Sequence, residues 1–175
     1  HGEDGKQIHV FNSRSASVGE TLIACKVREC EEQGMTFDET VSETEAYIEG
    51  QHTYFVLENL DTLRKNGRLT GIKSFVASAL NIKPVMGSTP QGTICQLGQA
   101  RGIKRALAKM AEQIARDSKQ TKEKVLAIAH CNCPERAREV ERMLLDKIRV
   151  KDSFIVDTAG ISTMYANDGG IIVVL

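Results

Sequence analysis

Hydrogen-bonding side chains gather near the carboxyl end of the sequence, just before a terminal apolar run. Ser162, Thr163 and Tyr165 offer hydroxyl donors there, and the pair Gly169–Gly170 allows another group to approach the backbone closely. A plain turn needs only about two or three such residues. The segment therefore fits either a simple reversal of the chain or a site that presents donors to a ligand.

Two arginines are candidate anion-binding residues. Arg68 lies between two expected helices, and Arg101 lies at the start of an amphipathic helix. A guanidinium can hold a carboxylate or phosphate through two parallel hydrogen bonds, and a helix start adds free N–H groups. Many surface arginines are merely solvated, so both an anion-binding role and plain exposed charge stay open.

The cluster of His130, Cys131 and Cys133 is a candidate metal or redox site. Structural zinc usually takes four ligands, whereas this cluster has one crowded cysteine pair and no second pair downstream. The Cys-X-X-Cys spacing of redox sites is also absent. We therefore favour thiols packed at the end of a strand and expect no metal. Five cysteines without framework spacing favour a reducing compartment, so we expect a cytoplasmic protein.

Several classes of function lack their sequence signals. The sequence contains no P-loop, no Gly-x-Gly-x-x-Gly after a strand and no Gly-x-Ser-x-Gly elbow. Its 23 basic and 23 acidic residues balance, which argues against recruitment to nucleic acid or to an anionic membrane. No apolar run approaches the roughly 20 residues of a membrane span. We predict neither a nucleic-acid partner nor a membrane span.

Hydrophobic periodicity predicts an α/β fold. Helices are expected at 17–34, 36–50, 58–69, 71–82, 103–114 and 134–148, and strands at 8–11, 53–57, 124–130, 153–159 and 169–175, with two more around the turn at 88–92. From residue 51 onward this gives a two-layer lobe in which helices cover one side of a mixed sheet of about six strands. The apolar segment 72–80 fits either a buried core helix or the wall of a cavity.

The first 50 residues supply one strand and two helices, too little for a core of their own. We expect residues 1–50 to be the end of an α/β N-terminal lobe and residues 51–175 to be the C-terminal lobe. The chain opens with His1 rather than Met and enters a strand almost at once. We therefore expect it to be part of a longer protein.

Five stretches, taken in order, resemble the DegV family. They are FNSRSASVGETL, YFVLENLDTLRKNGRLTGIKSFVASALNIKPVM, QARGIKRALAKM, AIAHCNCPERAREVERML and GISTMYANDGGIIVVL. The resemblance covers nearly the whole chain, and the second stretch is its most specific part. It implies two α/β lobes with a long-chain fatty acid between them, as in the lipid-carrying subunit of bacterial fatty acid kinase. That subunit has no nucleotide site and offers the carboxylate to a separate ATP-binding kinase subunit.

The sequence departs from the family pattern at the headgroup. In the family, hydroxyl residues of the N-terminal lobe and a histidine of the C-terminal loop bind the carboxylate. The Thr-Ser-Gln-Pro and Ser-Ser-Gly-Leu-Ser-type segments that carry those hydroxyls are absent, and Tyr165 stands at the histidine position. A phenol can donate one hydrogen bond but cannot supply the charge of an imidazolium.

The resemblance assigns roles to particular residues. We expect a carboxylate site at Ser162, Thr163, Tyr165 and Arg101, an acyl tunnel walled by Ile72, Phe75, Val76 and Leu80, and partner docking at Arg68 and Arg101. The protein would be a carrier without catalytic residues or cofactor, with a fatty acid as its ligand and a fatty acid kinase as its partner. It would be monomeric at full length. A phosphotransferase related to dihydroxyacetone kinase and a thiol or metal protein are the alternatives.

Overall fold

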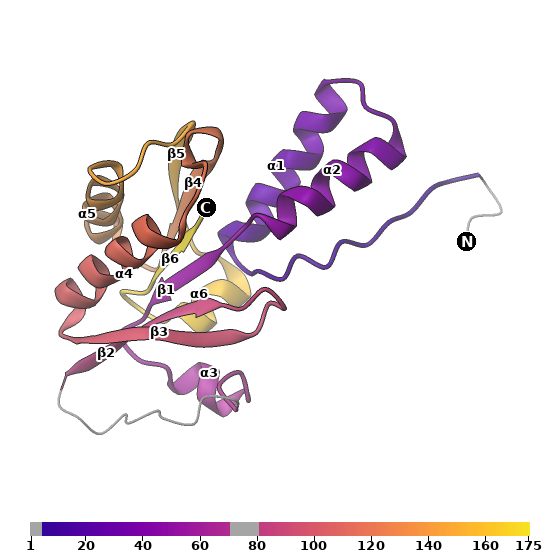
Figure 1. The fold of residues 1–175 in the computed structure, drawn as a ribbon. Helices are drawn as coiled ribbons and strands as arrows, with labels where there is room; N and C mark the ends of the chain where they lie inside the picture. Colours follow the sequence, from indigo (N-terminus) through magenta and orange to yellow (C-terminus); the bar gives the residue numbers. More distant parts are fainter. Residues whose placement is uncertain (1–4, 71–80) are drawn as a thin grey trace.

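The computed structural model describes residues 5–70 and 81–175, which form a mixed sheet with helices on both faces (Figure 1). The strands are β1 (Thr53–Val56), β2 (Ile82–Ser88), β3 (Ile94–Arg101), β4 (Val125–His130), β5 (Asp152–Asp157) and β6 (Ile171–Val174). They lie in the order β3-β2-β1-β6-β4-β5. β4 and β5 are parallel, and the other neighbours are antiparallel. The predicted α/β fold with a mixed six-stranded sheet is confirmed.

The helices match most of the predicted ones. They are α1 (Val18–Glu32), α2 (Phe37–Glu49), α3 (Asp61–Lys65), α4 (Ile103–Asp117), α5 (Pro134–Leu145) and α6 (Gly160–Ala166), with a short 3-10 turn at Thr121–Glu123. α6 was not predicted, because the polar residues before the last strand were interpreted as a turn or a donor site. The helix predicted at 71–82 lies mostly in 71–80, outside the described residues.

Local signals in the sequence explain where the helices begin and end. The Thr36 hydroxyl and the Glu39 carboxylate form a capping box at the start of α2. Gly67 follows α3 at φ 70°, a conformation that costs glycine little. There the backbone N–H groups of Gly67 and Arg68 bond to carbonyls of α3 and close the helix. This ending fixes where Arg68 leaves the helix.

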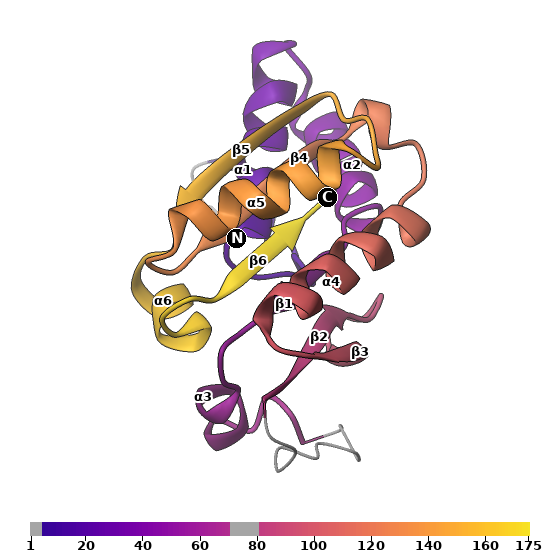
Figure 2. The same cartoon turned by 90° about the vertical axis from the view of Figure 1, so that its left-hand side faces the viewer.

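One face of the sheet is closed by α4 and α5. Figure 2 looks onto this face, with both helices in front of the strands. Strand residues such as Val56, Ile128 and Ile171 are fully buried against Met110 and Ile114 of α4. The regular apolar spacing that predicted α4 therefore corresponds to a tightly packed layer.

The opposite face is covered only in part. α1 packs over β4 and β6, where Val18 and Leu22 meet Ala127 and Val174. α3 and α6 contact each other, and their side chains pack with Leu57 just after β1. The two-layer prediction placed helices on one face of the sheet only and did not include the helices on this second face. The candidate site lies on this second face.

The strand predicted at residues 8–11 does not form. These residues are described, yet they pair with no strand of the sheet and run as extended chain. Ile8 and Val10 are 75% and 85% exposed. An isolated strand gains neither ladder hydrogen bonds nor burial, so β-propensity alone cannot form one.

Candidate ligand-binding site

A pocket of about 610 Å³ lies on the partly covered face of the sheet. Its floor is formed by β1, β2 and β6, and its sides by the segment before α1, by α3, by α6 and by the β2–β3 hairpin. This volume falls within the ~300–1,000 Å³ typical of small-molecule sites. The pocket is therefore the candidate site.

The walls of the pocket are largely apolar. The side chains that give it this character are those of Phe55, Leu57, Leu63, Ile94, Ile161 and Ile172. Phe55 and Leu57 alternate with Tyr54 and Val56, which point to the closed face. A hydrocarbon chain placed against these walls would be removed from water.

Hydroxyl groups converge at one end of the pocket. Ser15 Oγ lies 2.6 Å from Thr53 Oγ1, and the Thr53 backbone N–H donates to Ser88 Oγ at 3.4 Å. All three residues line the pocket, and Thr53 is only 8% exposed. They come from three separate segments: the chain before α1, the start of β1 and the end of β2.

The backbone around Ser15 is strained. Arg14 has φ 50° and Ser17 has φ 58°, ψ −126°, and both line the pocket. Residues other than glycine rarely adopt such backbone conformations, which cost on the order of 1–3 kcal/mol each. Ser15 Oγ also lies 2.0 Å from where a Cβ on Gly19 would be, so only glycine at 19 leaves room for this hydroxyl.

The other end of the pocket is formed by α6. Ser162 and Tyr165 stand three residues apart on one side of this helix, and both line the pocket half-buried. Thr163 is exposed, and its hydroxyl donates to Thr158 Oγ1 at 2.9 Å instead. The polar entrance to the last strand is thus a helix that brings two of the three predicted hydroxyls to the pocket.

Gly169 and Gly170 allow close approach of other parts of the protein. A Cβ on Gly169 would lie 2.7 Å from Arg136 Nη1, and one on Gly170 would lie 2.5 Å from the carbonyl oxygen of Ala166. Gly169 also has φ 79°. The glycine pair therefore permits the tight connection from α6 into β6.

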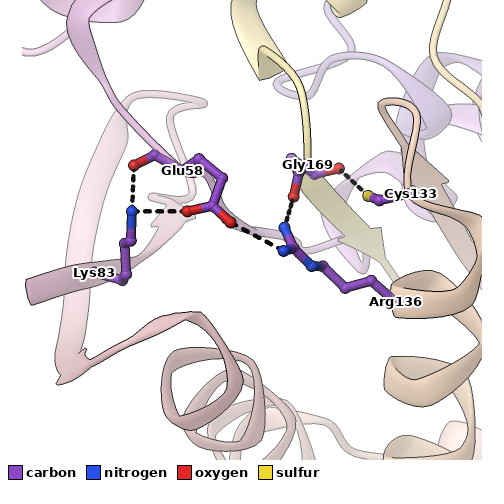
Figure 3. Close-up of polar contacts among 6 residues, drawn as sticks. Glu58, Lys83, Cys133, Arg136 and Gly169 are labelled. Atoms are coloured by element: carbon purple, nitrogen blue, oxygen red, sulfur yellow. Dashed lines mark hydrogen bonds and ion pairs between the residues drawn. The ribbon is translucent and has the colours of Figure 1, made fainter. Parts of the chain in front are cut away.

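A half-buried ion network holds that connection (Figure 3). Glu58 accepts from Arg136 Nη2 at 2.9 Å and pairs with Lys83 Nζ at 2.7 Å, while Lys83 also donates to the Glu58 carbonyl at 2.6 Å. Arg136 donates in addition to the Gly169 carbonyl. Burial alone would raise the pKa of Glu58, but Lys83 and Arg136 outweigh it and lower that pKa.

The two predicted arginines lie apart in the fold. Arg68 follows α3, is exposed and lines the pocket. Arg101 ends the edge strand β3 just before α4, is also exposed and is not among the pocket residues. The structure thus brings Arg68, Ser162 and Tyr165 to one pocket and leaves Thr163 and Arg101 outside it. Ile72, Phe75, Val76 and Leu80 lie outside the described residues.

The thiol cluster has the contacts of a packed corner. The Cys133 backbone N–H donates to Nδ1 of the buried His130 at 3.4 Å, and Cys133 Sγ lies 3.6 Å from the Gly170 carbonyl oxygen. Burial raises the pKa of the Cys133 thiol, which keeps it protonated. Within residues 5–70 and 81–175, no three His, Cys, Asp or Glu side chains are grouped to hold a metal ion.

Sequence reasoning missed the hydroxyl end and most of the apolar wall. Two signals were available. The run TYFVL is apolar at consecutive positions, which indicates a strand buried on both faces and so places Phe55 and Leu57 on the second one. The three serines in SRSAS stand directly before a helix, where hydroxyls commonly gather, but nothing in that pattern indicated Thr53 as their neighbour.

Comparison with known proteins gives consistent matches. The family model described as "Uncharacterised protein, DegV family" matches residues 2–174. A DegV domain-containing protein of Streptococcus gordonii is 32% identical over 165 residues, which cover 94% of this chain and 58% of the relative. The chain thus spans about three fifths of the length of such relatives. Among helices of the described residues, none has the length and hydropathy to cross a membrane.

Solved structures of similar proteins have the same fold, and two of them are described with a fatty acid. A DegV family protein from Ruminococcus gnavus, refined with vaccenic acid, is 72% identical with a TM-score of 0.95, covering 99% of this chain and 62% of that one. The Fatty Acid Kinase (Fak) B3 protein of Streptococcus pneumoniae, loaded with linoleic acid, is 30% identical with a TM-score of 0.83, covering 96% and 59%. With the family model matching almost end to end, this chain belongs to the DegV family.

Proposed function

We propose that this chain supplies one side of a binding site for a long-chain fatty acid and that the complete protein carries the acid to a fatty acid kinase. The observation that carries the proposal is the apolar pocket of about 610 Å³ with hydrogen-bonding groups at its ends. The similarity of the chain to the Ruminococcus gnavus and Streptococcus pneumoniae proteins, whose structures are described with fatty acids, supports a fatty acid as the ligand.

The acyl chain supplies the favourable free energy of binding. Each methylene removed from water contributes about 0.8 kcal/mol, so a long chain offsets the cost of ordering it and of desolvating the carboxylate. The charged headgroup must then find donors, because an unpaired buried carboxylate is strongly unfavourable. The pocket meets both needs with an apolar floor and polar ends.

The α6 end is the proposed carboxylate site. Ser162 and Tyr165 offer hydroxyl donors from one side of the helix, and the exposed Arg68 supplies positive charge to the same pocket. Thr163 and Arg101 lie outside this pocket and are not part of the proposed carboxylate site. Arg68 and Ile161 line the pocket and are both exposed, so a partner would approach the headgroup from their side.

Presentation to a kinase is the second part of the proposal. The 30% identity to the Fak B3 protein supports it, and the sequence has no phosphate-binding motif with which to use ATP itself. Arg68 and Arg101 are exposed cations suited to docking an acidic surface of the kinase. The carrier would contribute binding and orientation, and the kinase would transfer the phosphoryl group.

Lipid recovery and binding measurements test the first part. The complete protein, purified from lipid-replete cells and denatured, should release fatty acid in near-stoichiometric amount by mass spectrometry. Tyr165→Phe should weaken octadecanoic acid binding about 10-fold or more, the loss expected when a charged group loses one donor. Thr163→Ala, on the same helix but outside the pocket, should leave affinity unchanged. Protein that is repeatedly empty and fails to bind added fatty acid would overturn the proposal.

A reconstituted assay tests the second part. With the ATP-binding subunit of a bacterial fatty acid kinase, the loaded protein should yield acyl phosphate, and without that subunit it should not turn over ATP. Arg101→Glu should lower the rate of transfer without changing fatty acid affinity, because Arg101 lies outside the pocket. ATP turnover by the protein alone would instead favour the phosphotransferase alternative.

A further inference from the structure

We propose that the hydroxyl end of the pocket, formed by Ser15, Thr53 and Ser88, is a subsite for a neutral oxygen on the acyl chain. It would suit the protein to hydroxy or oxo fatty acids. The inference rests on the proposed function, because it assumes that the carboxylate lies at the α6 end. It adds a second point of recognition, placed along the hydrocarbon chain.

The two polar ends of the pocket are well separated. Thr53 pairs with Val174, whereas Val56 pairs with Ile171, where the connection from α6 enters β6. α6 therefore lies near the C-terminal end of β1, opposite the end that carries Thr53. Leu57 directly follows β1 at this C-terminal end. At about 3.3 Å per residue, Thr53 and Leu57 stand about 13 Å apart along the strand. A ligand held by its carboxylate near Tyr165 would meet the hydroxyl end partway along its chain.

The hydroxyl end is built to hold polar groups inside an apolar pocket. Thr53 is 8% exposed, and its hydroxyl has Ser15 Oγ as its hydrogen-bond partner. A hydroxyl can donate one hydrogen bond and accept two, so this pair retains capacity for a third group. An acyl wall needs no such groups, since valine in place of Thr53 would pack equally well.

The local backbone keeps Ser15 in place at a cost. Positive φ angles at Arg14 and Ser17 bracket it, and the missing Cβ of Gly19 makes room for its hydroxyl. Residues held in such conformations concentrate at functional sites, where the surrounding structure maintains the strain. The strain, the glycine and the convergence of three segments all concern the same hydroxyl.

Charge at this end favours a neutral ligand group. Arg14 and Glu20 also line the pocket, so one positive and one negative side chain accompany the hydroxyls. Glu20 accepts a hydrogen bond from Ser13 at 2.7 Å, which holds its carboxylate beside the hydroxyl end. The opposite charges of Arg14 and Glu20 leave this end without a net charge to attract a second carboxylate, whereas an alcohol or ketone needs only the hydroxyls as partners.

Binding of matched ligands to matched variants tests this subsite. The probes are octadecanoic acid and a hydroxyoctadecanoic acid with its hydroxyl at mid-chain, bound to the complete protein. The wild type should prefer the hydroxy acid by about three- to tenfold, the effect of one net hydrogen bond. Thr53→Val should abolish that preference, because it removes the hydroxyl that meets the ligand oxygen, and Thr53→Ser should retain it.

The control is another buried threonine. Thr44 of α2 is fully buried and does not line the pocket, and its hydroxyl finds no hydrogen-bond partner among the residues that the structure describes. Thr44→Val should leave the affinities for both ligands at wild-type values. Thermal melting of each variant shows that the compared proteins are folded.

Each other outcome overturns the subsite. Equal wild-type affinity for the two ligands, or a preference for octadecanoic acid, would mean that the hydroxyls hold only water. A large loss of octadecanoic acid binding in Thr53→Val would place the carboxylate itself at this end. Failure of the wild type to bind any fatty acid would instead defeat the proposed function, so the two failures are distinguishable.

Discussion

The two faces of the sheet differ although they share the same strands. Ile171 and Ile172 are neighbours in β6, yet Ile171 is fully buried beneath the α4–α5 layer and Ile172 is half-buried in the pocket. On the closed face, apolar side chains fill the space between sheet and helices. On the pocket face, polar groups and strained backbone line a pocket, and an ion network holds the connection beside it.

The difference separates stability from binding. A closed layer needs only apolar side chains of suitable volume, so any loss there appears as a loss of folding free energy. The pocket face keeps polar side chains that an apolar core would exclude, such as Thr53 and Tyr165. We interpret those groups as serving a ligand, and substitutions on the two faces should therefore have different consequences.

The largest expected effect comes from truncating Ile171. Ile171→Ala should lower the free energy of unfolding by about 2–5 kcal/mol, because it leaves a cavity in a packed layer. Ile172→Ala should cost less stability, since Ile172 is half-buried, but it should weaken fatty acid binding by removing part of the floor. Denaturant unfolding and ligand titration of both variants check this. Equal stability losses and equal affinities would contradict the difference between the faces.

The closed face could be predicted from the sequence because its signals are periodic. Ile103, Leu107, Met110 and Ile114 recur at helical spacing, and the run VLAIAH reads as a buried strand. The signals that mark the helix ends are also local: a capping box begins α2, and Gly67 closes α3. Such features depend on neighbours within a few residues, so the sequence displays them directly.

The pocket face depends on contacts between distant segments. Ser15 meets Thr53 across 38 positions of the chain, a distance over which no spacing rule operates. α6 has seven residues and begins at a glycine, and it is too short for its periodicity to stand out against the polar run. The reverse error occurred at residues 8–11, where strand-like composition lacks a pairing partner.

An intermediate effect is expected from the ion network beside the pocket. Glu58→Gln should lower the free energy of unfolding at pH 7 by about 1–2 kcal/mol, because Lys83 and Arg136 lose their charged partner while about a third of the Glu58 side chain is exposed. It should also loosen the α6–β6 connection, which Arg136 holds through the Gly169 carbonyl, and so weaken fatty acid binding. Thermal melting and ligand titration measure the two effects.

The same network predicts a dependence on pH. The pKa of Glu58 is lowered in the folded protein, so its stabilisation is complete above the unfolded pKa, about 4.3, and is lost as the pH falls through the lower folded value. Below that value, wild type and Glu58→Gln should have similar melting temperatures. Glu135→Gln is the control, because Glu135 forms an exposed pair with Arg138 on α5. A Glu58→Gln deficit that persists unchanged in acid would contradict the electrostatic origin.

The smallest effect is expected on the α1–α2 hairpin, which lies away from the closed face and meets the pocket only through the start of α1 (Figure 1). Thr36→Ala removes the capping box of α2 and should cost about 1 kcal/mol of stability. Fatty acid affinity should not change, because Ser15 and Ser17 are held by their own turn and by Thr53 rather than by α2. Thermal melting with ligand titration separates the two quantities. A loss of affinity would show that α2 helps to position the hydroxyl end, which would extend the binding face beyond the pocket residues themselves.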